Sequence, residues 1–231
     1  MVWIAPVGEQ GGFYLDARET TVAEFARFVE QTGYVTEAEE FGWSGVFSTD
    51  SLAWLPVDSA DWRRPRGPSR PPARPGDPVV QVSLRDVRAY AGWAGKRLPS
   101  EAEWQFAASQ GGKYREFPWG NDMLPGGQYR GNWWQGPFPY RDEVLDGYPG
   151  VAPVGSFPPT ENGLYDISGN VWEWTADVRA RTGESVIRGG SFLCSTSYCT
   201  GFNLRQRQYT AADSGLNHLG FRLLRDAAVE Q

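Results

Sequence analysis

Apolar residues recur at helical spacing in the first half of the chain and predict three helices. These start after Thr21, Ser83 and Ser100 and end at Gly33, at Gly95 and before Gly111, respectively. Thr21 and Ser100 are each followed three positions later by glutamate, which is the spacing of a capping box. Two short apolar runs, 13–16 and 79–82, are predicted to form strands.

The segment between the first two predicted helices lacks a regular pattern. Residues 34–62 carry many aromatic side chains without a helical or strand period, so we expect a packed loop region there. Residues 63–78 contain six prolines and five arginines, a composition that excludes a helix or a central strand. This stretch is interpreted either as a solvated polyproline-like loop or as a basic rim that faces a substrate.

After residue 113 the helical period does not return. Short apolar runs alternate with Gly, Pro, Asn and Asp, and the whole chain holds 28 glycines and 17 prolines, which is typical of turns and loops. The length of 231 residues suits one domain. We therefore predict a single compact α+β domain over residues 1–231, with a few helices early and an irregular, turn-rich β half.

The net charge and the hydropathy of the chain exclude some classes of binding partner. The net charge of −6 is opposite in sign to that of a typical nucleic-acid-binding protein. No run of 18 apolar residues is present, and the N-terminus lacks the charged and apolar regions of a signal peptide. Two cysteines cannot staple a secreted scaffold of this size, which favours a reducing compartment. We expect a cytoplasmic monomer with no nucleic-acid or membrane partner.

The two cysteines, Cys194 and Cys199, lie in one short stretch after the pair Gly189-Gly190. Five residues of extended chain span roughly 16 Å, whereas two thiolates on one metal ion lie within about 4.5 Å of each other. The segment must therefore turn if the thiols act together. Their spacing matches neither the redox CxxC motif nor the paired CxxC motifs of zinc sites. Two unrelated buried cysteines, a structural disulfide and a functional thiol pair are all compatible with it.

Two further stretches, residues 132–148 and 166–173, are rich in oxygen ligands. Carboxylates interleaved with Gly and Asn in tight loops can coordinate a hard cation through side-chain and backbone oxygens. The spacing is not that of an EF-hand, and Asx turns account for the same residues without a metal ion.

Several sequence blocks follow one another in a recognisable order. They are Phe13–Asp16 with Glu19-Thr20-Thr21, Trp93–Trp104, Phe117–Gly120, Gly169–Trp174, Arg188–Ser191 and Leu219–Arg222. Their sequences and order resemble those of the formylglycine-generating enzymes, or sulfatase-modifying factors. The resemblance covers nearly the whole chain, and the cysteine pair with Ser197-Tyr198 is similar to that of the catalytic subgroup.

The resemblance implies an irregular α+β fold, related to C-type lectin domains, with little regular secondary structure. It also implies a Cu(I) ion held by Cys194 and Cys199, which agrees with the preference of Cu(I) for soft sulfur ligands. In such enzymes the thiolate of a substrate cysteine, as in a sulfatase, joins the copper, O2 is activated there, and the cysteine becomes Cα-formylglycine through a thioaldehyde. The resemblance adds Ser191, Tyr198 and Trp172 to the catalytic pocket and Trp43, Ser195, Gly201 and His218 to the substrate-facing wall.

Structural Ca²⁺ is the second metal that the resemblance implies. One site would use Asn132, the Trp133 carbonyl, Asp146 and the Tyr148 carbonyl. The other would use Asp166, the Gly169 carbonyl, the Val171 carbonyl and Glu173.

The chain departs from the family around the implied copper site. A histidine that usually follows the first cysteine is Ser195 here, an Arg-Tyr-Arg run is replaced by Gly201-Phe202-Asn203, and an asparagine is replaced by His218. These changes alter the pocket that would recognise a sulfatase substrate, whereas both implied copper ligands are kept. If His218 faces the pocket, we expect its titration near pH 6.5 to alter activity between about pH 5.5 and 7.5.

The resemblance favours a copper-dependent, O2-using oxidase that acts on a peptidyl cysteine. The alternatives are a diverged copper oxidase with another thiol substrate and a non-catalytic ligand-binding module, because the fold also serves as a display scaffold. Non-haem iron chemistry that forms C–S bonds needs a facial set of histidines or carboxylates, which a chain with one histidine does not supply.

Overall fold

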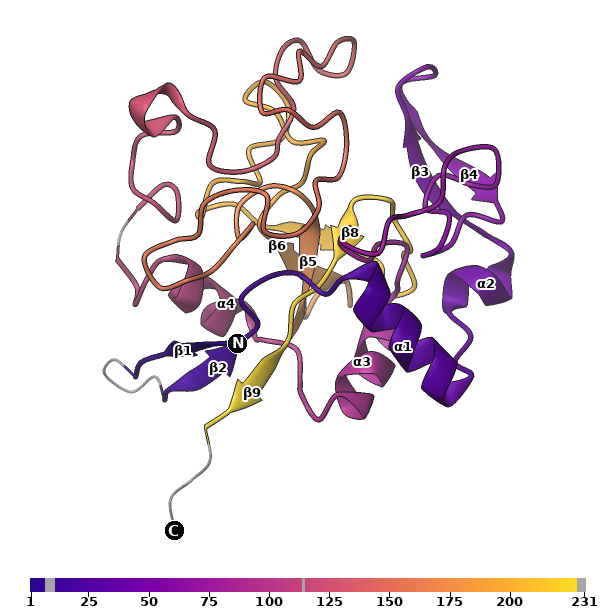
Figure 1. The fold of residues 1–231 in the computed structure, drawn as a ribbon, viewed down its shortest axis with the longest axis horizontal. Helices are drawn as coiled ribbons and strands as arrows, with labels where there is room; N and C mark the ends of the chain where they lie inside the picture. Colours follow the sequence, from indigo (N-terminus) through magenta and orange to yellow (C-terminus); the bar gives the residue numbers. More distant parts are fainter. Residues whose placement is uncertain (7–10, 114, 228–231) are drawn as a thin grey trace.

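The structure is a computed structural model that describes residues 1–6, 11–113 and 115–227. In this part of the chain the α-helices all lie in the first half of the sequence (Figure 1). They are α1 (Val22–Thr32), α2 (Glu37–Phe41), α3 (Leu84–Trp93) and α4 (Glu101–Ala108). Each begins with a capping box, in which a Thr or Ser side chain and the acidic side chain three residues later bond each other's backbone N–H. The three helices predicted from sequence are confirmed.

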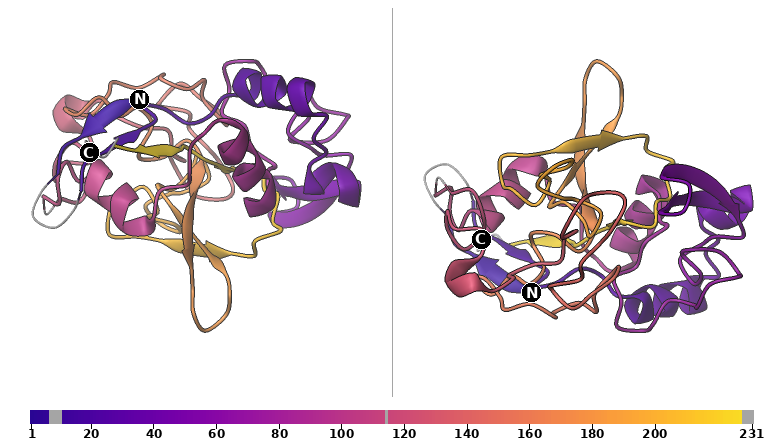
Figure 2. Two further views of the ribbon diagram at one scale, coloured as in Figure 1. Left: turned by 90° about the horizontal axis from the view of Figure 1, so that it is seen from below. Right: turned by 90° about the horizontal axis from the view of Figure 1, so that it is seen from above.

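The strands of the described residues form three sheets. An antiparallel sheet brings together β1 (Val2–Ile4), β2 (Phe13–Leu15) and β9 (Leu224–Asp226), so that the first and last strands share one sheet (Figure 1). A hairpin consists of β3 (Trp43–Ser48) and β4 (Ala53–Asp58). A four-stranded sheet has the order β7 (Gln208–Thr210), β6 (Ser185–Arg188), β5 (Trp172–Val178) and β8 (Leu219–Gly220). The connection between β5 and β6 projects from the body of the molecule (Figure 2).

Aromatic side chains fill the larger of two hydrophobic cores, which packs α1 and α3 against the four-stranded sheet. The ring of Phe25 in α1 lies 5.3 Å from that of Trp62 and 5.7 Å from that of Tyr90, and Tyr90 in turn lies 5.3 Å from Phe221. The smaller core packs α4, through the fully buried Trp104, against the sheet of β1, β2 and β9. The loops around the four-stranded sheet therefore rest on a closely packed base.

Residues 34–62 are not the loop region that the sequence predicts, because they form α2 and the β3–β4 hairpin. The prediction is wrong because large aromatic residues such as Trp43 and Trp54 occupy exposed positions of the hairpin, which hides the alternation of a half-buried strand. The hairpin lies directly on residues 215–217. The backbone N–H of Gly45 donates to the Gly215 carbonyl at 3.1 Å, and a Cβ on Gly45 would come within 2.8 Å of Leu216 Cδ2.

Residues 79–82 are buried, but they do not form the predicted strand. Val79 N–H donates to the Thr20 carbonyl and Gln81 N–H donates to the Leu216 carbonyl, so successive backbone bonds go to different segments. Gln81 also has a φ of 61°, which interrupts the extended conformation. A buried irregular segment has the same run of apolar residues as a buried strand, and this is why the sequence misleads here.

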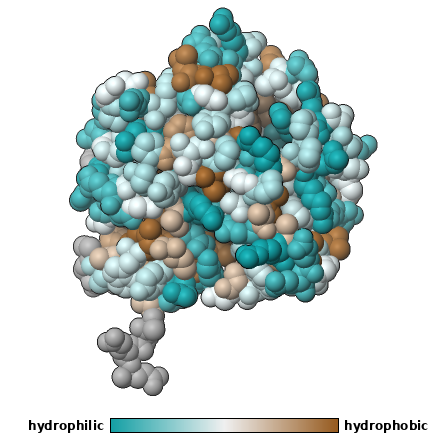
Figure 3. Space-filling view, in the orientation of Figure 1, coloured by the Kyte–Doolittle hydropathy of each residue, from teal (hydrophilic) through white to brown (hydrophobic). Residues whose placement is uncertain are grey.

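The outer surface is mostly hydrophilic on the face shown in Figure 3, where apolar residues form small separate patches. Within the described ranges, no helix is long and apolar enough to cross a membrane. Residues 63–78 contain no helix or strand, as their proline content predicts. The fold is thus a mixed helix-and-strand domain with little regular secondary structure, as the sequence predicts.

Candidate functional site

A cavity of about 530 Å³ opens beside Cys194 and Cys199. Its floor is apolar and comes from β5, β6 and the loops next to them, through Trp172, Ile187, Leu193 and Leu216. The cavity therefore lies against the four-stranded sheet. The backbone of β5 is held there by ladder hydrogen bonds to β6 on one side and to β8 on the other. This volume is within the range of small-molecule and peptide side-chain pockets.

The two cysteines are brought together by a turn, as their joint action would require. The N–H of Cys199 donates to the Ser195 carbonyl at 3.1 Å, and the N–H of Cys194 donates to the Ser191 carbonyl at 2.9 Å. The Cα atoms of Cys194 and Cys199 are 4.6 Å apart, and the structure joins their sulfurs in a disulfide bond. Two unrelated buried cysteines are excluded by this contact. Thiolate ligands for a metal form from this pair on reduction of the bond.

Ser191 and His218 form a neutral hydrogen-bonded pair on the cavity wall. Ser191 Oγ lies 3.1 Å from His218 Nδ1, and the ring of Trp54 lies 4.8 Å from the imidazole ring. Burial lowers the pKa of His218 to about 3. The expectation that His218 titrates between about pH 5.5 and 7.5 is therefore wrong, because the surrounding apolar groups disfavour the imidazolium.

The depressed pKa of His218 has a consequence for stability. Because the unfolded state keeps an ordinary histidine pKa near 6.5, acidification below that value protonates the unfolded chain first. We expect this residue to cost about 2 kcal/mol of stability at pH 5, relative to pH 7.5. His218→Asn should lose less stability than wild type over the same interval, as measured by urea unfolding at both pH values. Parallel losses in the two proteins would show that His218 does not contribute to the acid response.

The cavity has an aromatic rim, defined as Phe47, Trp54, Phe138 and Tyr198, and all four side chains belong to its lining. Phe47 stacks on Phe138 at 5.6 Å between ring centroids, and Phe138 stacks on Tyr198 at 4.7 Å. Phe47 and Trp54 are paired across the hairpin, so they project from the same face. Phe47 and Trp54 were not predicted as site residues, because the hairpin that carries them was not recognised from the sequence. Phe138, in the loop of residues 132–148, was not predicted either.

The other site residues predicted from the sequence differ in where they lie relative to the cavity. Trp172 forms part of the floor, and Gly201 packs under it, since a Cβ there would lie 2.3 Å from the indole ring. Ser195 is buried, and its hydroxyl lies 3.1 Å from that of Ser197. Trp43 is 46% exposed and packs beside Phe41, away from the residues that line the cavity. Its neighbours on the hairpin, Phe47 and Trp54, take the wall position.

The loop of residues 132–148 gathers oxygen atoms, but its own side chains already contact most of them. Asp146 accepts hydrogen bonds from the backbone N–H of Trp133 and Tyr148, at 3.2 and 3.0 Å. The side-chain amide of Gln135 donates to both the Trp133 carbonyl and Asp146. Asn132 donates its amide to the Gly150 carbonyl and to Asn170 instead. The Trp133 and Asp146 oxygens therefore converge on one point, while the Asn132 amide nitrogen points elsewhere.

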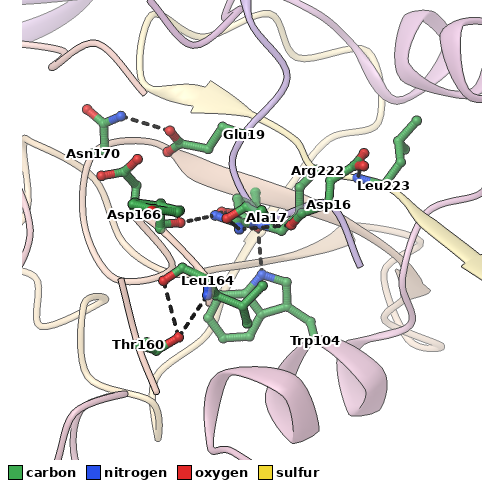
Figure 4. Close-up of polar contacts among 12 residues, drawn as sticks. Asp16, Ala17, Glu19, Trp104, Thr160, Leu164, Asp166, Asn170, Arg222 and Leu223 are labelled. Atoms are coloured by element: carbon green, nitrogen blue, oxygen red, sulfur yellow. Dashed lines mark hydrogen bonds and ion pairs between the residues drawn. The ribbon is translucent and has the colours of Figure 1, made fainter. Parts of the chain in front are cut away.

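The second oxygen-rich loop contributes to a buried cluster of charges, shown in Figure 4. Arg222 and Glu173 form an ion pair with N–O distances down to 2.7 Å, and both side chains are inaccessible to solvent. The indole N–H of Trp104 also donates to Glu173. Both carboxylate oxygens of Glu173 are thus occupied by hydrogen-bond donors, which leaves this residue poorly suited to bind a cation.

Glu19 and Asp166 lie near the same ion pair, and each has one buried carboxylate oxygen without a hydrogen-bond partner. Burial, together with the neighbouring carboxylates, raises the pKa of Glu19 well above its usual value. Burial raises the pKa of Asp166 to about 6. Three carboxylates therefore face one guanidinium, so that the cluster holds an excess of negative charge whenever Glu19 and Asp166 are ionised. Gly169 and Val171 lie in the same loop, between Asp166 and Glu173.

Across the described ranges, no group of three or more His, Cys, Asp or Glu side chains is arranged to hold a metal ion. A calcium ion in either loop would depend on backbone carbonyls, which Ca²⁺ accepts readily. A copper ion at the cysteines would depend on two sulfur atoms alone from this chain. The two cysteines lie side by side in the loop, with Cα atoms 4.6 Å apart, and soft thiolates are the donors that Cu(I) prefers.

Comparison of the whole fold with solved structures agrees with the fold class. PvdO from Pseudomonas aeruginosa superimposes over 96% of this chain and 83% of its own, with a TM-score of 0.69 and 25% sequence identity. This similarity confirms the compact mixed fold with little regular secondary structure.

Proteins of similar sequence identify the family of the chain more narrowly than the fold does. The Bos taurus protein named "Formylglycine-generating enzyme" is 44% identical over 245 residues, which cover 93% of this chain and 66% of that protein. The Thermomonospora curvata protein of the same name is 43% identical, over 93% of this chain and 82% of its own. A Bos taurus protein named "Inactive C-alpha-formylglycine-generating enzyme 2" is 42% identical, over 91% of this chain and 76% of its own. The chain thus spans about two thirds of the mammalian enzyme that it matches.

The profile described as "Sulfatase-modifying factor enzyme 1-like domain" matches residues 8–227. The blocks named from the sequence, from Phe13 to Arg222, all lie within this match. The chain belongs to the family of sulfatase-modifying factor enzyme 1-like domains.

Proposed function

We propose that the reduced protein is a copper-dependent oxidase that converts a cysteine in a polypeptide, such as a sulfatase, to Cα-formylglycine. One observation supports this most directly: Cys194 and Cys199 meet beside a cavity of about 530 Å³. The same chain is 43–44% identical to proteins named formylglycine-generating enzyme. A non-catalytic module has no need for two thiols that can share one ion at a cavity wall.

The two thiolates of Cys194 and Cys199 would hold Cu(I), which when bound supplies a site for the substrate thiolate and for O2 activation. The overall conversion of the side chain from a thiol to an aldehyde consumes one O2, two protons and two electrons, and it yields hydrogen sulfide and water. A thiol reductant, oxidised to a disulfide, would supply the two electrons. Both cysteines must be reduced before the metal can bind.

The surrounding side chains would orient the substrate and limit access of water. Ser191 and His218 remain uncharged in the pH range of activity and offer one donor and one acceptor on the wall. Within the described residues, the cavity lining contains no Asp, Glu, Lys or Arg. A thiol near this wall therefore meets mainly neutral and aromatic groups, which favour an apolar neighbouring residue in the substrate.

The test is oxidation of a cysteine peptide taken from a sulfatase by reduced protein loaded with Cu(I). We expect oxygen uptake together with appearance of the peptide aldehyde, detected by its reaction with a hydroxylamine probe and by mass spectrometry. Protein without copper should give neither signal. Oxygen uptake without aldehyde would instead indicate an oxidase with another thiol substrate.

We further propose that calcium binds at the loop of residues 166–173, with Asp166 as its charged ligand. The buried Asp166 Oδ1 atom without a hydrogen-bond partner supports this proposal. Glu173 fits less well, because Arg222 and Trp104 occupy its carboxylate. A divalent cation would offset the excess negative charge that Glu19 and Asp166 create beside Arg222.

Calcium is expected to raise the melting temperature, because binding to the folded state stabilises it by mass action. At a free concentration about 100-fold above Kd the gain is about 2.7 kcal/mol. Asp166→Ala should lose most of the difference between calcium and chelator, measured by differential scanning calorimetry. Asp50→Asn, an exposed change in the turn of the β3–β4 hairpin, is the matched control and should keep the response. Identical melting curves in calcium and chelator would leave these loops as Asx turns.

A further inference from the structure

Strand β7 is the last strand of the four-stranded sheet, and its outer edge borders the cavity. In the described part of the chain, β7 pairs with β6 on one side and with no strand on the other. All three of its residues, Gln208, Tyr209 and Thr210, line the cavity. Successive side chains of a strand point to opposite faces of the sheet. Contact with three residues in succession is what a cavity that runs along the edge of the strand gives, and backbone groups are available at such an edge.

The register of β7 and β6 supports this geometry. Gln208 lies opposite Ile187, which also lines the cavity. The side chains of this pair therefore project from the face of the sheet that forms the cavity floor. Tyr209 lies opposite Val186, which is buried and is not among the lining residues. Tyr209 thus reaches the cavity from the other face. The cavity bends around the free edge of β7 rather than lying over one face only.

The space beside this edge has the chemistry of a peptide groove. One side offers the unpaired backbone N–H and C=O groups of an edge strand. The aromatic rim and the cysteine pair border the same cavity. Extended polypeptides that add to a sheet edge gain affinity from main-chain hydrogen bonds and specificity from pockets for alternate side chains.

We propose that the polypeptide substrate binds as an extended segment paired with the free edge of β7. One side chain, that of the target cysteine, points to Cys194 and Cys199, and the side chains beside it alternate between the aromatic rim and solvent. This inference rests on the proposed function for the identity of the bound cysteine, but the pairing itself requires only that a polypeptide binds. The occupant is thus an extended stretch of polypeptide, and not a compact small thiol.

The experiment uses the full chain and sulfatase-derived peptides in which alanine replaces the target cysteine, so that no chemistry occurs. Single N-methyl groups are placed in turn on each backbone nitrogen, and affinity is measured by calorimetry. Strand pairing predicts an alternating pattern, in which every second N-methyl group weakens binding about five-fold or more, because one backbone hydrogen bond is lost. Amide hydrogen exchange within residues 208–210 should also slow when the unmodified peptide binds. The edge strand β1, in another sheet, should show no change.

The outcomes separate this inference from the proposed function. Alternation and protection of β7 without aldehyde formation from the cysteine peptide would support the pairing and overturn the proposed oxidase. Conversion of the cysteine peptide without alternation, or without protection of residues 208–210, would overturn the pairing and leave the oxidase intact. Failure of the peptides both to bind and to react would overturn both.

Discussion

Cys194→Ser and Cys199→Ser are each expected to abolish tight Cu(I) binding and aldehyde formation. Each change removes one of the two sulfur donors that the structure brings into contact, and a serine hydroxyl is a hard, neutral oxygen that Cu(I) binds poorly. The loss should exceed the roughly 10- to 100-fold that altering an outer contact of a metal site costs. Competition with a chromogenic Cu(I) chelator measures affinity, and peptide turnover measures activity.

Ser197→Ala is the matched control for these two variants. Ser197 lies between the cysteines in the same loop, is exposed and contacts Ser195 through its hydroxyl. It should keep copper affinity and turnover within about two-fold, as surface changes usually have small effects. Full turnover in either cysteine variant would contradict the copper proposal. Peptide binding that survives in both variants, with no turnover in wild type, would instead favour a non-catalytic binding module.

Arg222→Leu is expected to destabilise the fold by about 3–5 kcal/mol, the usual cost of removing one partner of a buried ion pair. The change leaves Glu173 without its guanidinium and removes bonds from Arg222 to the carbonyls of Ala17 and Tyr165. Urea unfolding at pH 7 measures the effect. Arg225→Leu, at an exposed position of β9 where the guanidinium lies over the ring of Tyr14, is the control and should cost no more than about 1 kcal/mol.

The double variant Arg222→Leu/Glu173→Leu should be more stable than Arg222→Leu alone, because it removes the unpaired charge as well.

The effect of Arg222→Leu should also depend on pH. Arg222 lowers the pKa values of Glu19 and Asp166, which burial raises, so its removal raises both further. A raised carboxyl pKa means that stability is lost as pH rises through it. The free energy of unfolding of the variant should therefore lie further below that of wild type at pH 8 than at pH 5. A difference between the two proteins that does not change with pH would argue against this electrostatic origin.

Local sequence signals were sufficient for the parts of the fold that form from neighbouring residues. The helices that start at Thr21, Ser83 and Ser100 satisfy their own N-termini with a side chain three positions on, so the sequence carries the information. The same spacing between Thr36 and Glu39 marks α2 and could have identified it. The turn that joins Cys194 to Cys199 is likewise local, because its bonds run within the loop itself.

The site wall could not be predicted in this way, because it depends on contacts between distant residues. Phe47 is positioned by its backbone N–H, which donates to Asn217 Oδ1 at 3.2 Å, across about 170 positions of sequence. The neutral state of His218 depends on burial against Trp54 and Ser191, which composition does not reveal. Trp43 was predicted to face the substrate from the family resemblance, whereas Phe47 and Trp54 were not identified because residues 34–62 carry no local signal of the hairpin.

The thiol pair and the hairpin side of the cavity come from two parts of the chain that meet only in three dimensions. The thiol pair lies in the loop after β6, whereas Phe47 and Trp54 lie on a hairpin that adds its own two strands and shares no sheet with that loop. Phe47 and Trp54 can therefore be varied while the sequence between Ser191 and Cys199 stays fixed. A combinatorial library restricted to these two hairpin positions is expected to retune which peptides the protein accepts, and to leave its affinity for Cu(I) as it was.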